Sequence, residues 1–156
     1  MEWLALLAET PLARALIVSP TVYLLVNAAH IMAIGMLFGS ILALDLRLLG
    51  LFEKVPLQTV AVFLSRMAGK GVALAVLTGL CLFSVKPTEY IQNTAFLAKL
   101  GLVALGIGNA LVVHVTPGWR AAVTQGSISA PLRVSAVISL VIWISAIVAG
   151  RWIGFL

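Results

Sequence analysis

The sequence predicts an all-α membrane protein, a bundle of four transmembrane helices with a short interfacial segment at its N-terminus. Hydrophobic residues make up 62% of the 156 residues and charged residues only 10%, whereas about a quarter of the residues in soluble domains are charged. The apolar residues also gather into four runs, each long enough to cross about 30 Å of hydrocarbon, which takes roughly 20 helical residues. We expect residues 1–156 to form a single integral membrane domain.

Residues 3–18 form the expected interfacial segment, with Trp3 at the level of the lipid headgroups. A signal peptide needs a positive start followed by a continuous apolar core. This N-terminus instead carries Glu2 and Glu9 and is interrupted by Pro11. We therefore expect that the segment is not cleaved.

Prolines and charged residues mark the ends of the four apolar runs, as expected at helix boundaries. Pro20 precedes the first run, and the charged Asp45 follows it. The second run stops before Pro87, the third stops before Pro117, and Pro131 begins the fourth. The transmembrane helices are therefore expected at about residues 21–44, 62–85, 93–115 and 132–150.

The three connections differ in character. Residues 46–58, LRLLGLFEKVPLQ, are amphipathic and are expected to lie along the membrane interface. Residues 86–93, KPTEYIQN, form a tight connection, whereas residues 117–131 are the longest and most polar link. Trp119 is expected to anchor this last link at the interface.

The basic residues predict the orientation of the bundle, because cytoplasmic loops are enriched in Lys and Arg. They lie at the ends of apolar runs, so the formal charge of +5 does not indicate a nucleic-acid partner. More of them lie where the first and third helices finish, which predicts a bacterial inner-membrane protein with both termini in the periplasm. The larger group is Arg47, Lys54, Arg66, Lys70, Arg120 and Arg133; the smaller is Arg14, Lys86, Lys99 and Arg151.

Three chemically active side chains are expected at one depth in the membrane. At 1.5 Å per helical residue, His30 lies about 12 Å, Lys99 about 9 Å and Cys81 about 6 Å from the surface where the chain begins. Asn27 lies on the same face of the first helix as His30 and is a further candidate for cofactor binding. His114 lies near the opposite surface, so we do not expect both histidines to hold one iron atom.

The residues leave three interpretations of His30 open. A neutral imidazole can donate a hydrogen bond across helices and hold them together, or it can be an axial ligand of haem iron. It can also form a copper site with Cys81 and either Met32 or Met36, since soft ligands suit Cu(I). Lys99 either extends to the headgroups or serves the haem as a second ligand or a propionate partner.

A charged cluster is expected near the opposite surface, formed by Asp45, Arg66, Lys70 and Arg133. Ionisable groups inside membranes usually face the bundle interior and have a partner. We therefore interpret Asp45 as an ion-pair partner of one of the three basic residues, rather than as a proton relay. His114 either joins this cluster or extends to the headgroups, and a role as metal ligand is the less favoured alternative.

Gly35 and Gly39 form a GxxxG pair on the opposite side of the first helix from His30. Such pairs let helix backbones approach closely, either within one bundle or between subunits. We therefore expect a homo-oligomer or a subunit of a larger membrane complex.

Two stretches resemble known families. Residues 30–50, HIMAIGMLFGSILALDLRLLG, have an early histidine, a glycine-containing middle and an Arg-Leu exit, and residues 96–106 read FLAKLGLVALG. Together they resemble the four-helix bacterial protoporphyrinogen oxidase family that works without molecular oxygen, and the membrane domain of copper-resistance D proteins. The closest overall resemblance is to an uncharacterised bacterial family of small four-helix membrane proteins, with its LDLRLLG exit and a GR pair near the C-terminus.

The resemblance to the oxidase implies a b-type haem. In that family a histidine of the first helix and a lysine of the third serve the haem, and these positions match His30 and Lys99 here. The oxidase's tryptophan after the histidine has no counterpart, and its Tyr-His stretch past the arginine is replaced by LGLFEKV at residues 49–55. The resemblance therefore implies haem binding more directly than it implies oxidase activity.

The sequence thus predicts an integral membrane redox protein that binds haem b. Its electron partner would be a quinone or a redox partner protein, or it would carry out porphyrin-linked oxidoreduction. Two alternatives stay open: a non-catalytic membrane subunit or oligomer whose polar residues are structural, and a copper-handling membrane protein. Whether the chain is an enzyme is left undecided.

Overall fold

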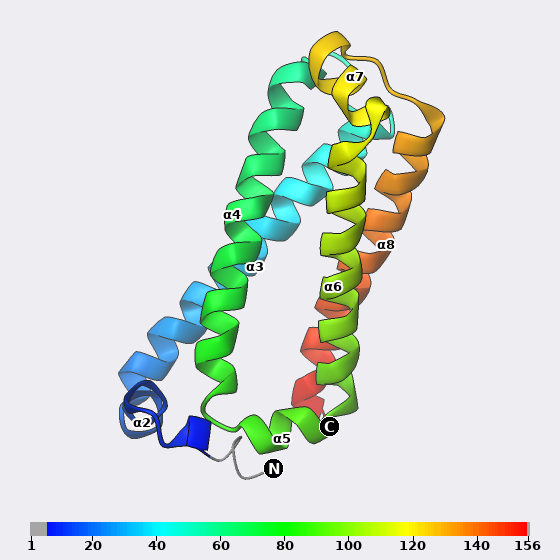
Figure 1. Ribbon diagram of the computed structural model, residues 1–156. Helices are drawn as coiled ribbons and strands as arrows, with labels where there is room; N and C mark the ends of the chain where they lie inside the picture. The colour runs from blue at the N-terminus through cyan, green and yellow to red at the C-terminus, as the bar shows by residue number, and fades with distance from the viewer. Residues whose placement is uncertain (1–5, 156) are drawn as a thin grey trace.

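The computed structural model describes residues 6–155, and within them the chain forms only helices and the connections between them (Figure 1). Four helices in this part are long and apolar enough to cross a membrane, which confirms the predicted fold class. These long helices are α3 (Pro20–Leu48), α4 (Leu57–Phe83), α6 (Thr94–Val115) and α8 (Ala130–Trp152), and the short ones are α2 (Pro11–Val18), α5 (Pro87–Gln92), α7 (Pro117–Gln125) and the 3-10 helix η1 (Ile153–Phe155).

Short polar side chains and prolines begin several helices. The Ser19 side chain accepts a hydrogen bond from the backbone N–H of Val22, and Pro20 occupies the first turn of α3. Thr116 caps α7 in the same way, with Pro117 in its first turn. Such caps satisfy amide groups that have no partner inside the helix, which explains why these helices begin where the sequence predicted a boundary.

Two helix ends differ by several residues from the expected limits of the spanning segments. The first spanning helix was expected to end at residue 44, but α3 continues through Asp45 to Leu48. A charged residue can continue a helix here because Asp45 is buried, while Arg47 donates to the carbonyl oxygens of Val55 (2.9 Å) and Glu53 (3.3 Å) in the following loop.

The second spanning helix begins earlier than expected, at Leu57 directly after Pro56, and not near residue 62. The connections are also more ordered than predicted, because residues 86–93 contain α5 and the polar link after α6 contains α7. The expected interfacial segment includes α2 (Pro11–Val18), whereas Trp3 lies outside the described residues.

The long helices form two antiparallel pairs, α3 with α4 and α6 with α8 (Figure 1). The pairs are joined mainly through α3 and α8, while α4 and α6 have almost no direct contact. α7 covers the end of the bundle where α3 finishes and contacts α4, α6 and α8. α2 and the C-terminal end of α8 both lie at the other end of the bundle (Figure 1).

Small residues allow the closest approach between helices. A Cβ atom added to Gly71 of α4 would lie 2.7 Å from the backbone nitrogen of Leu37 in α3. A Cβ atom on Gly106 of α6 would lie 2.7 Å from the indole ring of Trp143 in α8. These two glycines therefore mark the contact points within the two helix pairs.

The buried core is small, and many large apolar side chains face outward, among them Leu24, Leu77, Leu105 and Val141. An exposed apolar surface of this extent fits contact with lipid. The main core cluster lies at the α7 end of the bundle and comprises Leu44, Leu48, Leu57, Ala61, Trp119, Ala122, Leu132 and Ala136.

Candidate functional site

Two regions inside the bundle carry polar side chains, and the first surrounds His30. The Nδ1 atom of His30 lies 2.8 Å from the hydroxyl oxygen of Thr78 in α4. That hydroxyl donates its own hydrogen to the carbonyl oxygen of Leu74, at 2.7 Å. His30 Nδ1–H must therefore be the donor to Thr78, and the neutral imidazole carries its lone pair on Nε2.

Glycines make room for both polar side chains of this region. A Cβ atom on Gly79 would lie 3.2 Å from Cε1 of His30, and one on Gly150 of α8 would lie 3.3 Å from Cδ of Lys99. Lys99 lies close enough to the His30 imidazole for the two side chains to interact electrostatically. The structure thus brings His30 and Lys99 to one region of the bundle, whereas the side chain of Asn27 is exposed.

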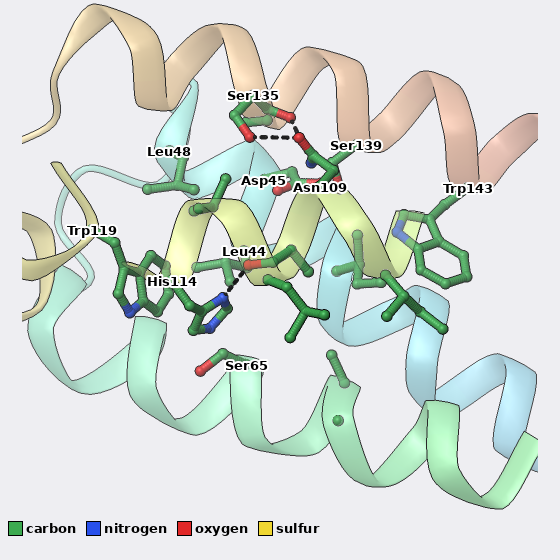
Figure 2. Close-up of a pocket in the computed structure, with 18 of the residues that line it drawn as sticks. Leu44, Asp45, Leu48, Ser65, Asn109, His114, Trp119, Ser135, Ser139 and Trp143 are labelled. Carbon is green, nitrogen blue, oxygen red and sulfur yellow. Dashed lines mark hydrogen bonds between the residues drawn. The ribbon is translucent and has the colours of Figure 1, made fainter. Parts of the chain in front are cut away.

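The second region is a cavity of about 300 Å³, which we call the Asp45 cavity. Its walls come from α3, α4, α6 and α8, and Trp119 of α7 closes one end (Figure 2). Most of the lining is apolar, with Leu37, Ile41 and Val72 among the wall residues. The polar side chains that line it are Asp45, Ser65, Asn109, His114, Ser135 and Ser139.

Most of these polar side chains are satisfied by hydrogen bonds within the protein. The Ser135 hydroxyl donates to Oδ1 of Asn109 (3.0 Å), and Nδ2 of Asn109 donates to the Ser135 carbonyl oxygen (3.4 Å). Ser65 donates to the carbonyl oxygen of Val62. His114 Nδ1 lies 2.7 Å from the carbonyl oxygen of Ala110, and since a carbonyl only accepts, Nδ1–H is the donor.

Asp45 is the exception. It is only 6% exposed, and within the described part of the chain its Oδ2 atom is buried without a hydrogen-bond partner. Ser139 lies next to it on the facing helix (Figure 2). Asp45, in the wall of the cavity, therefore has a buried carboxyl oxygen whose hydrogen-bonding capacity the protein itself leaves unused.

The charged cluster that the sequence predicted around Asp45 is not formed as a set of ion pairs. Across residues 6–155 the one ion pair joins Lys86 and Glu89, at 3.0 Å. The physical reason is that the three basic partners lie on outward faces of α4 and α8, where their side chains are exposed. These exposed basic residues are Arg66, Lys70 and Arg133.

Three other predicted site residues, Gly35, Gly39 and Cys81, do not line the Asp45 cavity. A Cβ atom on Gly35 or Gly39 would meet nothing within 4 Å, so the GxxxG pair faces outward and does not pack inside this bundle. Cys81 is half-buried. Among the described residues, no group of three His, Cys, Asp or Glu side chains is arranged to hold a metal ion.

Sequence reasoning missed the pairing of Asn109 with Ser135 and the cavity itself. The signal for the pair was present, because an asparagine inside a spanning helix needs a partner, and Ser135 is a polar residue of the next spanning helix. The cavity left no signal, because its volume depends on how far apart α4 and α6 stand.

The chain belongs to a family of unknown function, DUF6644, which it matches over residues 18–156. This agrees with the expectation of an uncharacterised membrane-protein family. No curated protein and no solved structure matches the chain. The resemblance to the protoporphyrinogen oxidase and to copper-resistance D proteins stays a prediction.

Proposed function

We propose that this chain is an integral membrane redox protein that holds haem b through His30. The observation that carries the proposal is the hydrogen bond between His30 Nδ1–H and Thr78, at 2.8 Å. A ligating histidine typically donates its other ring N–H to a neighbouring oxygen, which fixes the ring orientation and the tautomer. His30 is held in this state, with the lone pair on Nε2.

The residues around His30 fit this assignment. Lys99 provides a second nitrogen donor in the same region, and its stem is packed over Gly150. Gly79 leaves space at the imidazole ring that a larger residue would fill. When bound, haem b supplies a reversible one-electron couple whose potential depends on its ligands and on burial. Its electron partner is proposed to be a quinone or a redox partner protein.

An optical spectrum of the detergent-purified protein tests the proposal. Protein from haem-replete cells should show a Soret band and, after reduction with dithionite, sharp α and β bands. His30→Ala should lose these bands while keeping its helical circular dichroism spectrum. His114→Ala is the matched control, because His114 faces the Asp45 cavity, and it should keep the bands. A featureless spectrum of the unaltered protein would refute haem binding.

A second candidate, a non-catalytic subunit or oligomer, is favoured by the outward-facing Gly35 and Gly39. Since nothing in this bundle covers them, a helix of another subunit can approach there. Replacing both by leucine should shift the detergent-solubilised protein to a smaller species in light scattering. Gly101→Leu, at another open glycine on α6, should not. An unchanged mass after the double replacement would refute association through this face.

We also propose the bacterial inner membrane as the location, with both termini in the periplasm. The excess of basic residues at the α7 end of the bundle supports this orientation, and α2 and the C-terminal end of α8 lie at the opposite end (Figure 1). A reporter enzyme that is active only in the periplasm should be active when it is fused to either end of the chain. A reporter that is active only in the cytoplasm should be inactive at both ends. The reverse pattern would refute the orientation.

A further inference from the structure

The unpartnered carboxyl group of Asp45 is the starting point for a second site. An ionised carboxylate in an apolar environment is costly unless it is paired and hydrogen-bonded. Asp45 is 6% exposed, lines the cavity, and keeps its Oδ2 atom without a partner. Ionisable groups inside membranes usually mark a binding site or a transport path. A partner supplied from outside the chain would satisfy this oxygen.

The other polar groups of the cavity indicate the chemistry of that partner. The hydroxyl hydrogens of Ser65 and Ser135 and one N–H of the Asn109 amide are engaged with acceptors of the protein itself. The ring N–H of His114 is engaged with the Ala110 carbonyl, which leaves the lone pair of the neutral ring on Nε2. Ser139 lies beside Asp45 and can donate one hydrogen bond to its carboxyl group, but the Oδ2 atom is left without a partner among residues 6–155. The carboxyl group therefore keeps a free acceptor.

The charge of the lining indicates the same class of ligand. Of the described residues that line the cavity, none is a lysine or an arginine, so the chain provides no counter-charge next to Asp45. Trp119 and Trp143 stand at the two ends of the cavity, with Asp45 between them (Figure 2). Indole faces attract cations and also pack well against apolar groups.

The cavity can be reached from the surface that faces lipid. Gly69 of α4 and Leu111 of α6 both line it and are both exposed, and these two helices have almost no direct contact. At this point the opening between α4 and α6 has an apolar residue on each side. The volume of about 300 Å³ lies at the lower end of the usual range for small-molecule sites.

We propose that the Asp45 cavity binds a small lipophilic amine in its protonated form, which enters from the lipid phase between α4 and α6. The ammonium group donates a hydrogen bond to Oδ2 of Asp45 and provides its counter-charge. The apolar body of the amine lies against the aliphatic walls and the indole rings. This site is separate from His30, and its assignment does not depend on haem binding.

Equilibrium dialysis of the full-length protein in detergent micelles tests the proposal, with empty micelles as the blank. The probes are adamantylamine and phenylbutylamine, each compared with its neutral counterpart, adamantanol or phenylbutanol. We expect saturable binding of at least one amine, close to one molecule per chain, and at least tenfold weaker binding of its alcohol. Asp45→Asn should weaken amine binding by about 30-fold or more, as when one partner of a buried charge pair is removed.

Two matched controls separate the site from general effects of charge and fold. Glu89→Gln removes a carboxylate outside the cavity and should bind the amine like the unaltered protein. Gly69→Leu, at a position where an added Cβ meets nothing within 4 Å, should keep the fold but weaken binding severalfold, because Gly69 lines the cavity and the leucine side chain would occupy part of its volume. Gly101→Leu, at an equally open position outside the cavity, should not.

Three results would overturn the proposal. One is the absence of saturable binding of either amine to the unaltered protein. The second is unchanged amine binding in Asp45→Asn. The third is equal binding of an amine and its alcohol, which would make the cavity a site for neutral apolar molecules.

Discussion

Gly71 offers the most direct test of how the α3/α4 pair is packed. A Cβ atom at Gly71 would lie 2.7 Å from N, 2.8 Å from Cα and 2.9 Å from Cβ of Leu37. Non-bonded carbon atoms prefer separations of about 3.5–4.0 Å, so the added methyl group in Gly71→Ala has to push the two helices apart by several tenths of an ångström or more. The contacts are with backbone, which has no alternative rotamer. Overpacking of this kind costs about 1–3 kcal/mol.

Gly69→Ala is the matched control, two residues earlier on the same helix, where an added Cβ meets nothing within 4 Å. Alanine is the better helix former by about 1 kcal/mol, so this variant should be as stable as the unaltered protein or more stable. Both free energies of unfolding can be measured by titrating dodecyl sulfate into mixed micelles while following helical circular dichroism. A Gly71→Ala variant as stable as Gly69→Ala would refute the close packing of α3 on α4.

Three further predictions concern individual side chains. Thr78→Val keeps the shape of the side chain but removes the acceptor for His30 Nδ1–H. If His30 holds haem, the affinity for haem should therefore fall by about 10–100-fold. The rate of haem transfer to a competing acceptor protein measures this, and an unchanged rate would contradict the prediction. Asp45→Leu removes a buried carboxyl with an unpartnered oxygen and should raise the free energy of unfolding by about 1–3 kcal/mol, whereas a marked loss of stability would reveal a structural partner. Burial raises the pKa of the Tyr90 phenol, so the folded state holds this proton more tightly than the unfolded state. The protonated phenol should therefore make its full contribution to stability below about pH 10. That contribution should be lost as the pH rises through the pKa of the folded state. An ultraviolet titration against Tyr90→Phe checks the last prediction, and a phenolate that forms at the ordinary pKa would contradict it.

The fold class followed from composition and from the length of the apolar runs, because a chain in lipid has to satisfy its backbone hydrogen bonds within each helix. Boundaries marked by a cap and a proline, such as Ser19 with Pro20, were predicted well. The end of α3 was not, because the rule that charges end a spanning helix does not apply where the charge points inward. Asp45 lies inside the bundle, so the helix continues past it.

The candidate site was predictable only in part. Counting residues along the helices was enough to expect His30 and Lys99 at one depth, since helical rise is constant. The partners of polar groups were harder, because they depend on the rotation of each helix about its axis. Asp45 was expected to pair with exposed basic residues, and no sequence pattern revealed that the helices would instead enclose a cavity around it.

The arrangement of the helices in two pairs has a consequence for how the chain can be assembled. Most helix contacts lie within the α3/α4 pair and within the α6/α8 pair, and the connection between the pairs runs through α5. We therefore expect each pair to enter the membrane as a hairpin and the two pairs to dock afterwards through α3 and α8. A chain divided after Val85 loses one peptide bond but none of these contacts. Fragments 1–85 and 86–156, expressed together, should therefore associate and co-purify as a complex of two helical hairpins.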